Sequence, residues 1–515
     1  MPPKSTPQPR MCIVRPLFVD APTLVLVSAA GARIMVKIER EIPIQIDPGE
    51  NSFLKGIYAP IATEITADDL KVIGEIPKDL EGAYLRNGPN PIFQPRGRYH
   101  WFDGDGMVHG IEFHDGKATY RNRWIRTEAF AAEQVANRTI WPGLMDRPDP
   151  DVPRGAGSDG WLKDSANTDL VFHNGYALAL WYQCGLPYKI DPRTLETLGV
   201  ERFGGKLERA VSAHAKVDPV SGELLFFDYA TKPPYMTYNV VSARGELTHH
   251  EPIDLPGSRL PHDMAFTEHY SLLMDLPLFW DPQLLERKVH KVTYYPELPS
   301  RFGILPRYGT NADVKWFEAS PCYIYHVVNA WEDGDEFVME ACRVIQAEPG
   351  AKRGEGELAR MRAFLRLEAQ LCRWRFNLVT GAVTEEQLDD EKTEWPTINR
   401  HMMGRKSRYA YNSMVPHYEG LVKYDTVRGM SEKYLFGAGR TSNEAPFAPR
   451  AGARDEDDGY VVTFVADANA ANSSEVVILA AKNFANGPIA RVQIPQRVPV
   501  GFHSTWIPGD QLRAR

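Results

Sequence analysis

Four histidines stand in apolar surroundings, where a charged ring would be costly to bury. They are His214 in AVSAHAKV, His262 in RLPHDMAF, His326 in YIYHVVNA and His503 in PVGFHSTW. Each imidazole must be held neutral and oriented, either by hydrogen bonds within a core or by a metal ion, for which neutral imidazole is a common ligand. The residue types alone allow both interpretations.

The spacing of these histidines does not match a local metal motif. About 48, 64 and 177 residues separate them along the chain. Short metal motifs place two ligands on one element, so these four would have to come from separate elements. A shared metal requires a fold that brings distant segments to one point, and hydrogen-bonded core histidines remain the simpler alternative on spacing alone.

The elements that must position the histidines are short strands. From about residue 70 onward, apolar runs such as TDLVFHNGYALALWY, GELLFFDYA and GYVVTFVAD are bounded by Gly, Pro, Asn and Asp. Such a pattern predicts an all-β sandwich, barrel or propeller. The length favours a propeller, whose inner strands converge on one axis, but no exact repeat is present, so its blades must be divergent.

Two local patterns are specific enough to predict single elements. His326 lies in an expected strand over 322–329, followed by a turn at 332–335 and a returning strand through Phe337 and Val338. Leu and Met recur at steps of three and four residues over 355–368, which predicts an amphipathic surface helix or a long insertion between blades.

Composition excludes several classes of function. The 515 residues are 43% hydrophobic and 24% charged, with a net charge of −8, as expected of a globular protein without a basic field for nucleic acid. The five cysteines contain no CxxC pair, which favours a reducing, cytoplasmic location and disfavours thiolate zinc. No apolar run approaches the roughly 20 residues that span a bilayer, so we expect a soluble protein or one lying on a membrane.

The first 35 residues differ from the rest of the chain. They carry Lys4 and Arg10 and then the apolar run LVLVSAA, but Asp20 and Pro22 interrupt the approach to that run and weaken a signal-peptide interpretation. We therefore expect residues 1–35 to be a dispensable extension, with Met35 as a possible natural start, and residues 36–515 to form a single propeller domain.

Catalytic arrangements without a metal find little support. The chain has no GxSxG motif, which disfavours an α/β-hydrolase, and Gly104 and Gly106 lie between expected strands and not at a helix start. Acidic pairs such as Asp389 and Asp390 stand in polar loops, where they are expected to face solvent. A pair of glycosidase carboxylates remains open at this point.

Several segments resemble the carotenoid cleavage oxygenase superfamily, which includes lignostilbene dioxygenases and isoeugenol-cleaving enzymes. They follow the family order over nearly everything after about residue 50 and are YLRNGPNP (84–91), FDGDGMVHG (102–110), SANTDLVFHNGYALAL (165–180), SAHAKVDPVSGEL (212–224), HDMAFTEHY (262–270), YHVVNAWEDGDE (325–336), NEAPFAPR (443–450), EDDGY (456–460) and GFHSTW (501–506).

The resemblance implies a seven-bladed β-propeller with one non-haem Fe(II) on its axis, under a dome of loops and helices. The implied iron ligands are His214, His262, His326 and His503. Four neutral imidazoles differ from the common site of two histidines and one carboxylate. Glu394 and Glu444 match the family glutamates that support His326 and His503, whereas Gln183 stands where a third glutamate would support His262.

The resemblance further implies cleavage of a C=C bond with O2 into two carbonyl products, with the alkene supplying the electrons. Thr168 matches a family threonine near an open iron position, although a buried strand threonine is an equally simple interpretation. Phenol-cleaving relatives carry a Lys-Glu pair where Tyr182 and Gln183 align. Tyr182 is thus a candidate substrate contact, and the missing lysine favours a carotenoid or apocarotenoid over a stilbene or phenylpropanoid.

Three further alternatives stay open. A family relative could isomerise or bind its polyene without cleaving it, or the propeller could be a scaffold for a protein partner. The apolar stretch 274–285, MDLPLFWDPQLL, could rest on a membrane at a tunnel mouth or lie inside as a loop. The sequence leaves the oligomeric state open.

Overall fold

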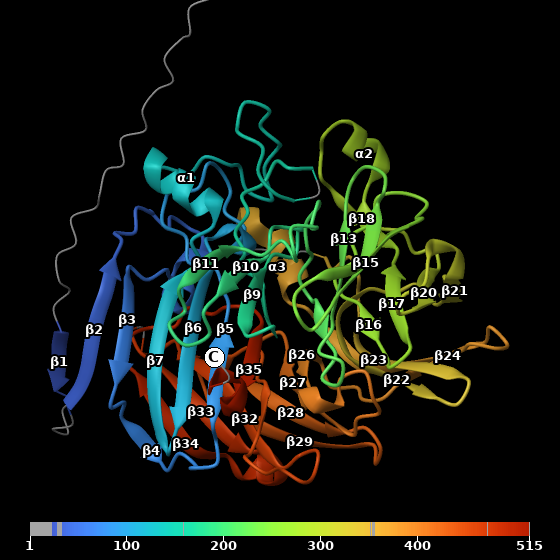
Figure 1. Ribbon diagram of the computed structural model, residues 1–515. Helices are drawn as coiled ribbons and strands as arrows, with labels where there is room; N and C mark the ends of the chain where they lie inside the picture. Colours follow the sequence, from blue (N-terminus) through green and yellow to red (C-terminus); the bar gives the residue numbers. More distant parts are fainter. Residues whose placement is uncertain are drawn as a thin grey trace, which may run out of the picture.

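The computed structural model describes residues 23–27, 33–157, 159–350, 352, 356–470 and 472–513. Its strands form seven antiparallel sheets of four or more strands, together with one small two-stranded ribbon. The sheets follow one another around a ring, as seen in Figure 1. The predicted all-β fold, a seven-bladed propeller, is confirmed.

Five blades are built from strands that follow each other in the chain, apart from a short insertion in the third of them. The first two contain β8 (Asp169–His173), β9 (Tyr176–Leu180), β10 (Tyr188–Ile190) and β11 (Thr197–Val200), then β12 (Lys216–Val217), β13 (Leu224–Tyr229), β14 (Met236–Val241) and β15 (Leu247–Ile253). The other three contain β16 (Ala265–Phe266), β17 (Tyr270–Asp275), β20 (Ser300–Pro306) and β21 (Lys315–Ala319), then β22 (Ile324–Asp333), β23 (Glu336–Val344), β24 (Ala369–Asn377) and β25 (Val383–Gln387), then β26 (Thr393–Thr397), β27 (Tyr409–Met414), β28 (Gly420–Asp425) and β29 (Met430–Leu435).

The remaining two blades close the ring with strands from both halves of the chain. One contains β30 (Arg440–Ser442), β31 (Phe447–Pro449), β32 (Gly459–Asp467), β33 (Ser474–Ala480), β34 (Pro488–Ile494) and the early strand β4 (Val72–Gly74). The other contains β1 (Thr23–Val27), β2 (Arg33–Glu41), β3 (Thr63–Asp68), β7 (Lys117–Trp124), β6 (Met107–His114), β5 (Gly82–Arg86) and the late strand β35 (Ser504–Pro508). The inner strand of each blade is an edge strand of its sheet, and the closed ring protects these short edges around the axis.

The core lies between neighbouring blades. One apolar cluster joins Leu272 and Phe302 of the β16–β21 blade to Met339, Trp374 and Phe376 of the next blade, and each of these side chains is buried. Aromatic and β-branched residues suit such half-covered pleated surfaces, which is why the short apolar runs form strands. The expected hairpin around His326 is confirmed as β22 and β23.

Some of the helices, together with long connections, lie above the strands in Figure 1. The helices are α1 (Glu128–Ala136), α2 (Pro282–Glu286), α3 (Ala359–Leu365) and α4 (Gly509–Arg513), and the ribbon consists of β18 (Leu278–Trp280) and β19 (Val292–Tyr294). Short 3₁₀ turns are η1 (Ser52–Leu54), η2 (Gly56–Tyr58), η3 (Trp101–Asp103), η4 (Asn311–Asp313), η5 (Gly356–Leu358), η6 (Arg400–Met402) and η7 (Ala481–Asn486). The helical pattern over 355–368 therefore becomes η5 followed by α3, shorter than expected.

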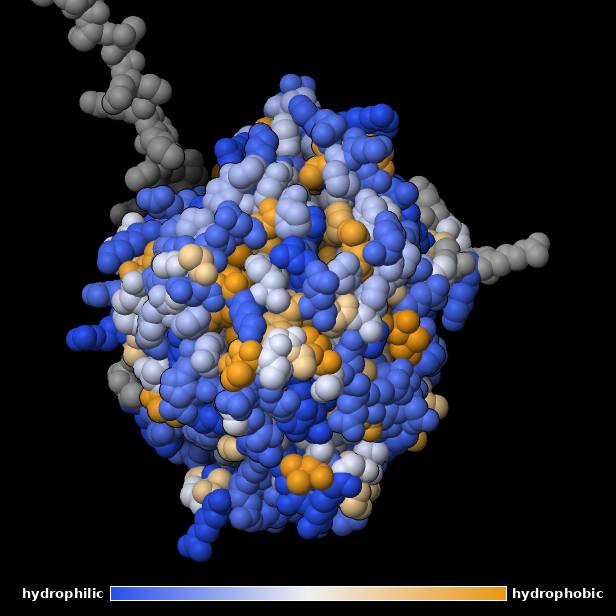
Figure 2. All heavy atoms as spheres, turned by 90° about the vertical axis from the view of Figure 1, so that its right-hand side faces the viewer, coloured by the Kyte–Doolittle hydropathy of each residue, from blue (hydrophilic) through white to orange (hydrophobic). Residues whose placement is uncertain are grey.

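The predicted extension of residues 1–35 lies mostly outside the described residues. Within it, β1 pairs with β2 at the outer edge of its blade, and Met35 of β2 pairs with Asp68 of β3. Among the described residues, no helix is long and apolar enough to cross a membrane. On the face shown in Figure 2, hydrophobic side chains form small separate groups among hydrophilic ones.

Candidate metal centre

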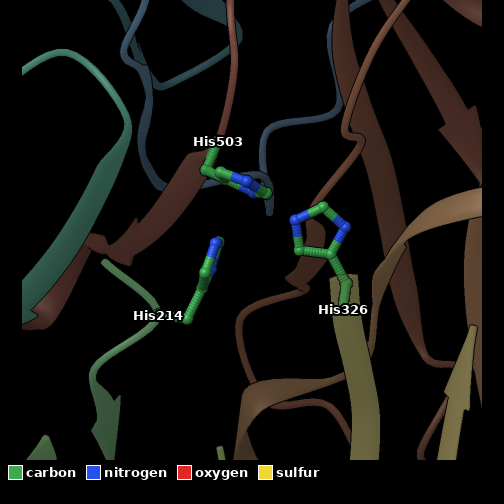
Figure 3. Close-up of side chains that lie close together, drawn as sticks. All are labelled: His214, His326 and His503. Atoms are coloured by element: carbon green, nitrogen blue, oxygen red, sulfur yellow. The ribbon is translucent and has the colours of Figure 1, made fainter. Parts of the chain in front are cut away.

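The four histidines occupy corresponding places in four blades. His214 precedes β12, His262 precedes β16, His326 lies within β22, and His503 directly precedes β35. β12, β16 and β22 are the first strands of their blades, and β35 is the last strand in the order of its sheet. All four therefore lie at the inner side of the ring. Figure 3 shows the rings of His214, His326 and His503 pointing toward one another.

The distances between the rings are those of one compact cluster. Ring centroids lie 4.4 Å apart for His214 and His503, 4.6 Å for His326 and His503, and 4.9 Å for His214 and His326. Potential ligand atoms of these three residues all lie within 4.8 Å of one another. The His262 ring lies next to them, 4.9 Å from His214 and 5.2 Å from His326 by ring centroid, but its nitrogen atoms are outside that 4.8 Å group.

Local irregularities of the backbone aim two of these rings. His214 has a φ of 67°, a left-handed conformation that costs energy for a residue other than glycine. Its backbone N–H donates to Asp169 Oδ2 at 3.1 Å, and this hydrogen bond helps to hold the conformation. The pairing of β22 with β23 shifts register on both sides of Val327, so His326 sits in a bulged stretch of the kind that re-aims a side chain.

Buried carboxylates orient the rings from behind. His326 Nδ1 lies 2.5 Å from Glu394 Oε2, and His503 Nδ1 lies 3.0 Å from Glu444 Oε1. A carboxylate that accepts the Nδ1 proton leaves the lone pair on Nε2, which suits the ring as a metal ligand. The two glutamates singled out in the sequence therefore lie beside the histidines with which they were matched.

Asp169 is a further carboxylate at the cluster, and the sequence argument did not include it. Besides its bond to the His214 backbone, its Oδ2 lies 3.8 Å from His214 Nδ1. The residue directly follows Thr168 in a segment that carries the family resemblance, which is the signal that could have identified it. It is a third buried carboxylate beside the cluster, next to His214.

The cluster offers donor atoms that lack partners within the protein. His214 Nε2 and His326 Nε2 are buried and have no hydrogen-bond partner among the described residues. Leaving a buried polar atom unsatisfied is costly, and a metal ion would satisfy both atoms at once. Imidazole donors suit iron, zinc, copper and nickel, so the residues fit a transition-metal site.

Burial sets the protonation of the rings. It lowers the pKa of His214, His262 and His326 well below the usual range, which favours the neutral form that binds metal. Burial opposes a charge on His503 as well, but the adjacent Glu444 carboxylate together with Asp169 and Glu394 more than offsets that effect and raises the pKa of His503.

His262 has a different environment from the other three histidines. Its ring lies between two tyrosines, with centroids 5.7 Å from Tyr182 and 5.1 Å from Tyr325. Gln183 lies close to the Tyr182 side chain: burial raises the pKa of Tyr182, and the Gln183 amide opposes that rise in part. Among the described residues no hydrogen bond joins Gln183 to His262, so the support of His262 by Gln183 stays a prediction.

Thr168 is buried and lines the same cavity as His262. Its hydroxyl donates to Asn167 Oδ1 at 3.1 Å and accepts the Tyr182 N–H at 3.3 Å, while its carbonyl accepts the His503 N–H at 3.1 Å. The structure therefore places Thr168 at the cluster, and its hydroxyl also serves the local backbone.

A cavity of about 570 Å³ leads from the cluster toward the dome, within the size range of small-molecule sites. Its wall is largely apolar and aromatic, and includes Phe102, Leu260, Leu278, Trp280, Tyr323, Tyr325, Met361, Phe364, Leu365, Trp395 and Phe502. The pattern over 355–368 is thus more than a surface helix, because α3 forms part of this wall. The apolar stretch 274–285 also contributes to it through β18.

Comparisons with known proteins show similarity to one family over most of the chain. The model of the retinal pigment epithelial membrane protein family matches residues 58–508. The carotenoid 9,10(9',10')-cleavage dioxygenase of Crocus sativus is 35% identical over 506 residues, covering 90% of each chain. The isoeugenol monooxygenase of Pseudomonas nitroreducens is 32% identical over 476 residues, covering 88% of this chain and 98% of that one.

A solved structure of a related enzyme has the same fold. The lignostilbene dioxygenase of Pseudomonas brassicacearum superimposes with a TM-score of 0.80 at 28% identity, over 91% of this chain and 100% of that chain. The match extends through all four histidine-bearing segments, because the family model spans residues 58–508. The chain therefore belongs to the retinal pigment epithelial membrane protein and carotenoid oxygenase family, and it is an enzyme of the dioxygenase type.

Proposed function

We propose that the protein is a non-haem Fe(II) dioxygenase that cleaves a C=C bond of a carotenoid or apocarotenoid with O2 to give two carbonyl products. The observation that carries this proposal is the convergence of four buried imidazoles, three of which (His262, His326 and His503) line a largely apolar cavity. Its partners would be O2 and a lipophilic alkene.

His214, His262, His326 and His503 would hold the iron, whose chemistry would be to bind and activate O2 next to the alkene. Glu394 and Glu444 orient two of the rings through their Nδ1 atoms. The electrons come from the alkene itself, so the proposal requires no general acid, general base or nicotinamide cofactor.

The cavity wall would choose which double bond reaches the cluster. Phe102, Tyr325 and Trp395 line the cavity, and Tyr325 and Trp395 pack against metal-site histidines. Such flat side chains can hold a planar conjugated chain while they exclude water. Thr168 would limit the space beside the metal position.

The similarity to an isoeugenol monooxygenase and a lignostilbene dioxygenase favours a second candidate, the cleavage of a phenylpropanoid or stilbene alkene. We rank it second because Tyr182 and Gln183 stand where those relatives align a Lys-Glu pair. Tyr182 can offer a hydroxyl to a substrate oxygen, but burial raises its pKa and it brings no positive charge for a phenolate.

Incubation of the iron-loaded protein with an apocarotenal and, separately, with a hydroxystilbene tests this proposal. We expect aldehyde products and O2 uptake with the apocarotenal. Cleavage of the phenolic substrate alone would contradict our preference. Altered polyene without O2 uptake would indicate an isomerase or binder, and absence of stoichiometric iron would indicate a scaffold.

Changing Gln183 to glutamate tests the role of this position. A carboxylate close to His262 would raise the basicity of that ring, and we expect up to about tenfold tighter metal binding, measured by competition with a chelator. Gln370→Glu on β24, outside the cavity, adds the same charge as a control. Unchanged metal affinity and turnover in Gln183→Glu would show that the position does not support His262.

A further inference from the structure

The wall of the large cavity is positively charged, in contrast to the protein as a whole. Its charged lining residues, apart from histidines, are Arg98, Arg147, Lys288, Lys291 and Arg360, against only Asp146 and Asp159. The full chain has 59 Lys and Arg but 67 Asp and Glu. Cations are therefore concentrated where a ligand would enter.

Both lining carboxylates are already engaged by neighbours. Asp146 lies 3.6 Å from Arg98 Nε and accepts the Arg98 backbone N–H at 3.2 Å. Asp159 Oδ2 lies 2.6 Å from His290 Nε2. Both lining carboxylates therefore already have partners within the protein.

Three of the cations have no carboxylate partner among the described residues: Arg147, Lys288 and Lys291. The Lys288 ammonium lies 5.6 Å from the ring centroid of Trp161, a distance at which the ring face attracts a cation. This contact links the segment after α2 to the connection that carries Trp161. Arg360 differs, since it lies 3.2 Å from Glu348.

The exposure of these residues shows which end of the cavity they occupy. Arg147, Lys288 and Lys291 are exposed to solvent, whereas His262, His326, His503 and Thr168 are buried. The cavity therefore runs from the histidine cluster, past an apolar and aromatic wall, to an opening that we call the cationic rim, defined by Arg147, Lys288 and Lys291.

We propose that the cationic rim binds the carboxylate end of an acidic substrate, whose conjugated chain extends inward to the histidine cluster. The substrate class would be an apocarotenoid acid or another long alkene that ends in a carboxylate. The inference rests on the proposed function. Ammonium and guanidinium groups form strong hydrogen bonds to carboxylates, and a rim of one sign also raises the local concentration of an anion.

The same cations could attract an anionic membrane surface, but the observations favour the substrate. The three residues line a cavity wall and so face a bound molecule. The face shown in Figure 2 carries its hydrophobic side chains in separate groups and has no continuous apolar plane of the kind that enters a bilayer.

A matched pair of substrates tests the proposal: an apocarotenoid acid and its methyl ester, with the iron-loaded protein. We expect the acid to have a KM about tenfold lower than the ester, a difference that decreases with added salt. In the triple variant Arg147→Gln, Lys288→Gln, Lys291→Gln, the KM for the acid should rise to the KM for the ester. The control Lys78→Gln, Lys117→Gln, Arg193→Gln removes the same charge from exposed residues outside the cavity.

Each outcome separates the two proposals. Equal KM values for acid and ester in the unaltered protein would overturn the cationic rim and leave the oxygenase function in place. If neither compound is cleaved, the oxygenase proposal fails, and quenching of tryptophan fluorescence still compares the binding of acid and ester. A triple variant that loses binding to vesicles containing phosphatidylserine but keeps the acid preference would also overturn the proposal.

Discussion

Replacing His326 with alanine is expected to remove the bound iron and to reduce C=C cleavage more than 100-fold. The ring lies within 5.2 Å of the three other histidine rings by centroid distance, and its buried Nε2 has no partner in the described part of the chain. The change also leaves the buried Glu394 carboxylate without its imidazole. Loss of an orienting partner alone costs about 10–100-fold in metal affinity or activity, so loss of a ligand should cost more.

Metal analysis of the purified variant measures this effect directly. His249→Ala is a suitable control, because His249 lies outside the cluster and, among the described residues, its side chain contacts the Gly309 carbonyl and the rings of Tyr238 and Tyr308. The control should retain about one iron per chain. A His326→Ala protein that kept one equivalent of iron would disprove the proposed ligand set.

Changing Glu394 to glutamine is expected to lower iron affinity by about 10–100-fold with little change in fold. Glu394 is fully buried, and burial raises its pKa well above the usual range, while the Trp395 N–H and His503 favour the charged form. A glutamine retains the shape and can accept the His326 Nδ1 proton. It removes the charge, so His326 becomes a weaker donor.

Metal titration against a chelator, with circular dichroism to verify folding, measures the loss of affinity. Glu340→Gln provides a matched control. Glu340 on β23 is equally buried and accepts a hydrogen bond from Arg373 on the neighbouring strand β24, at 2.5 Å. We expect that control to lower Tm without weakening metal binding. An equal loss of iron in both variants would mean that Glu394 acts only on stability.

Much of the fold could be predicted from local patterns. The strand over 322–329 and its returning partner follow from aromatic and β-branched residues around a polar turn, and the structure confirms them as β22 and β23. The ring closure could not be predicted locally. Pairing of β35 with β5, such as Ser504 with Arg86, joins segments far apart in sequence and carries no short-range signal.

The candidate site, like the fold, could be predicted from the sequence only in part. Histidines in apolar runs are visible in the sequence, but their distances depend on four blades and on features such as the left-handed backbone of His214. Asp169 was missed because its contact with His214 crosses from one blade to the next. Whether Gln183 lies beside Tyr182 or beside His262 depends on side-chain directions that neighbouring sequence does not reveal.

The order of the strands has a consequence for biosynthesis. His503 directly precedes β35, which is the last strand in chain order among the described residues and completes the blade begun by β5. A nascent polypeptide still lacking that segment has an open ring and three of the four imidazoles. The complete set of four imidazoles therefore forms only after nearly the whole chain has been synthesised, and a copy that ends before His503 would lack both the fourth imidazole and the circular closure.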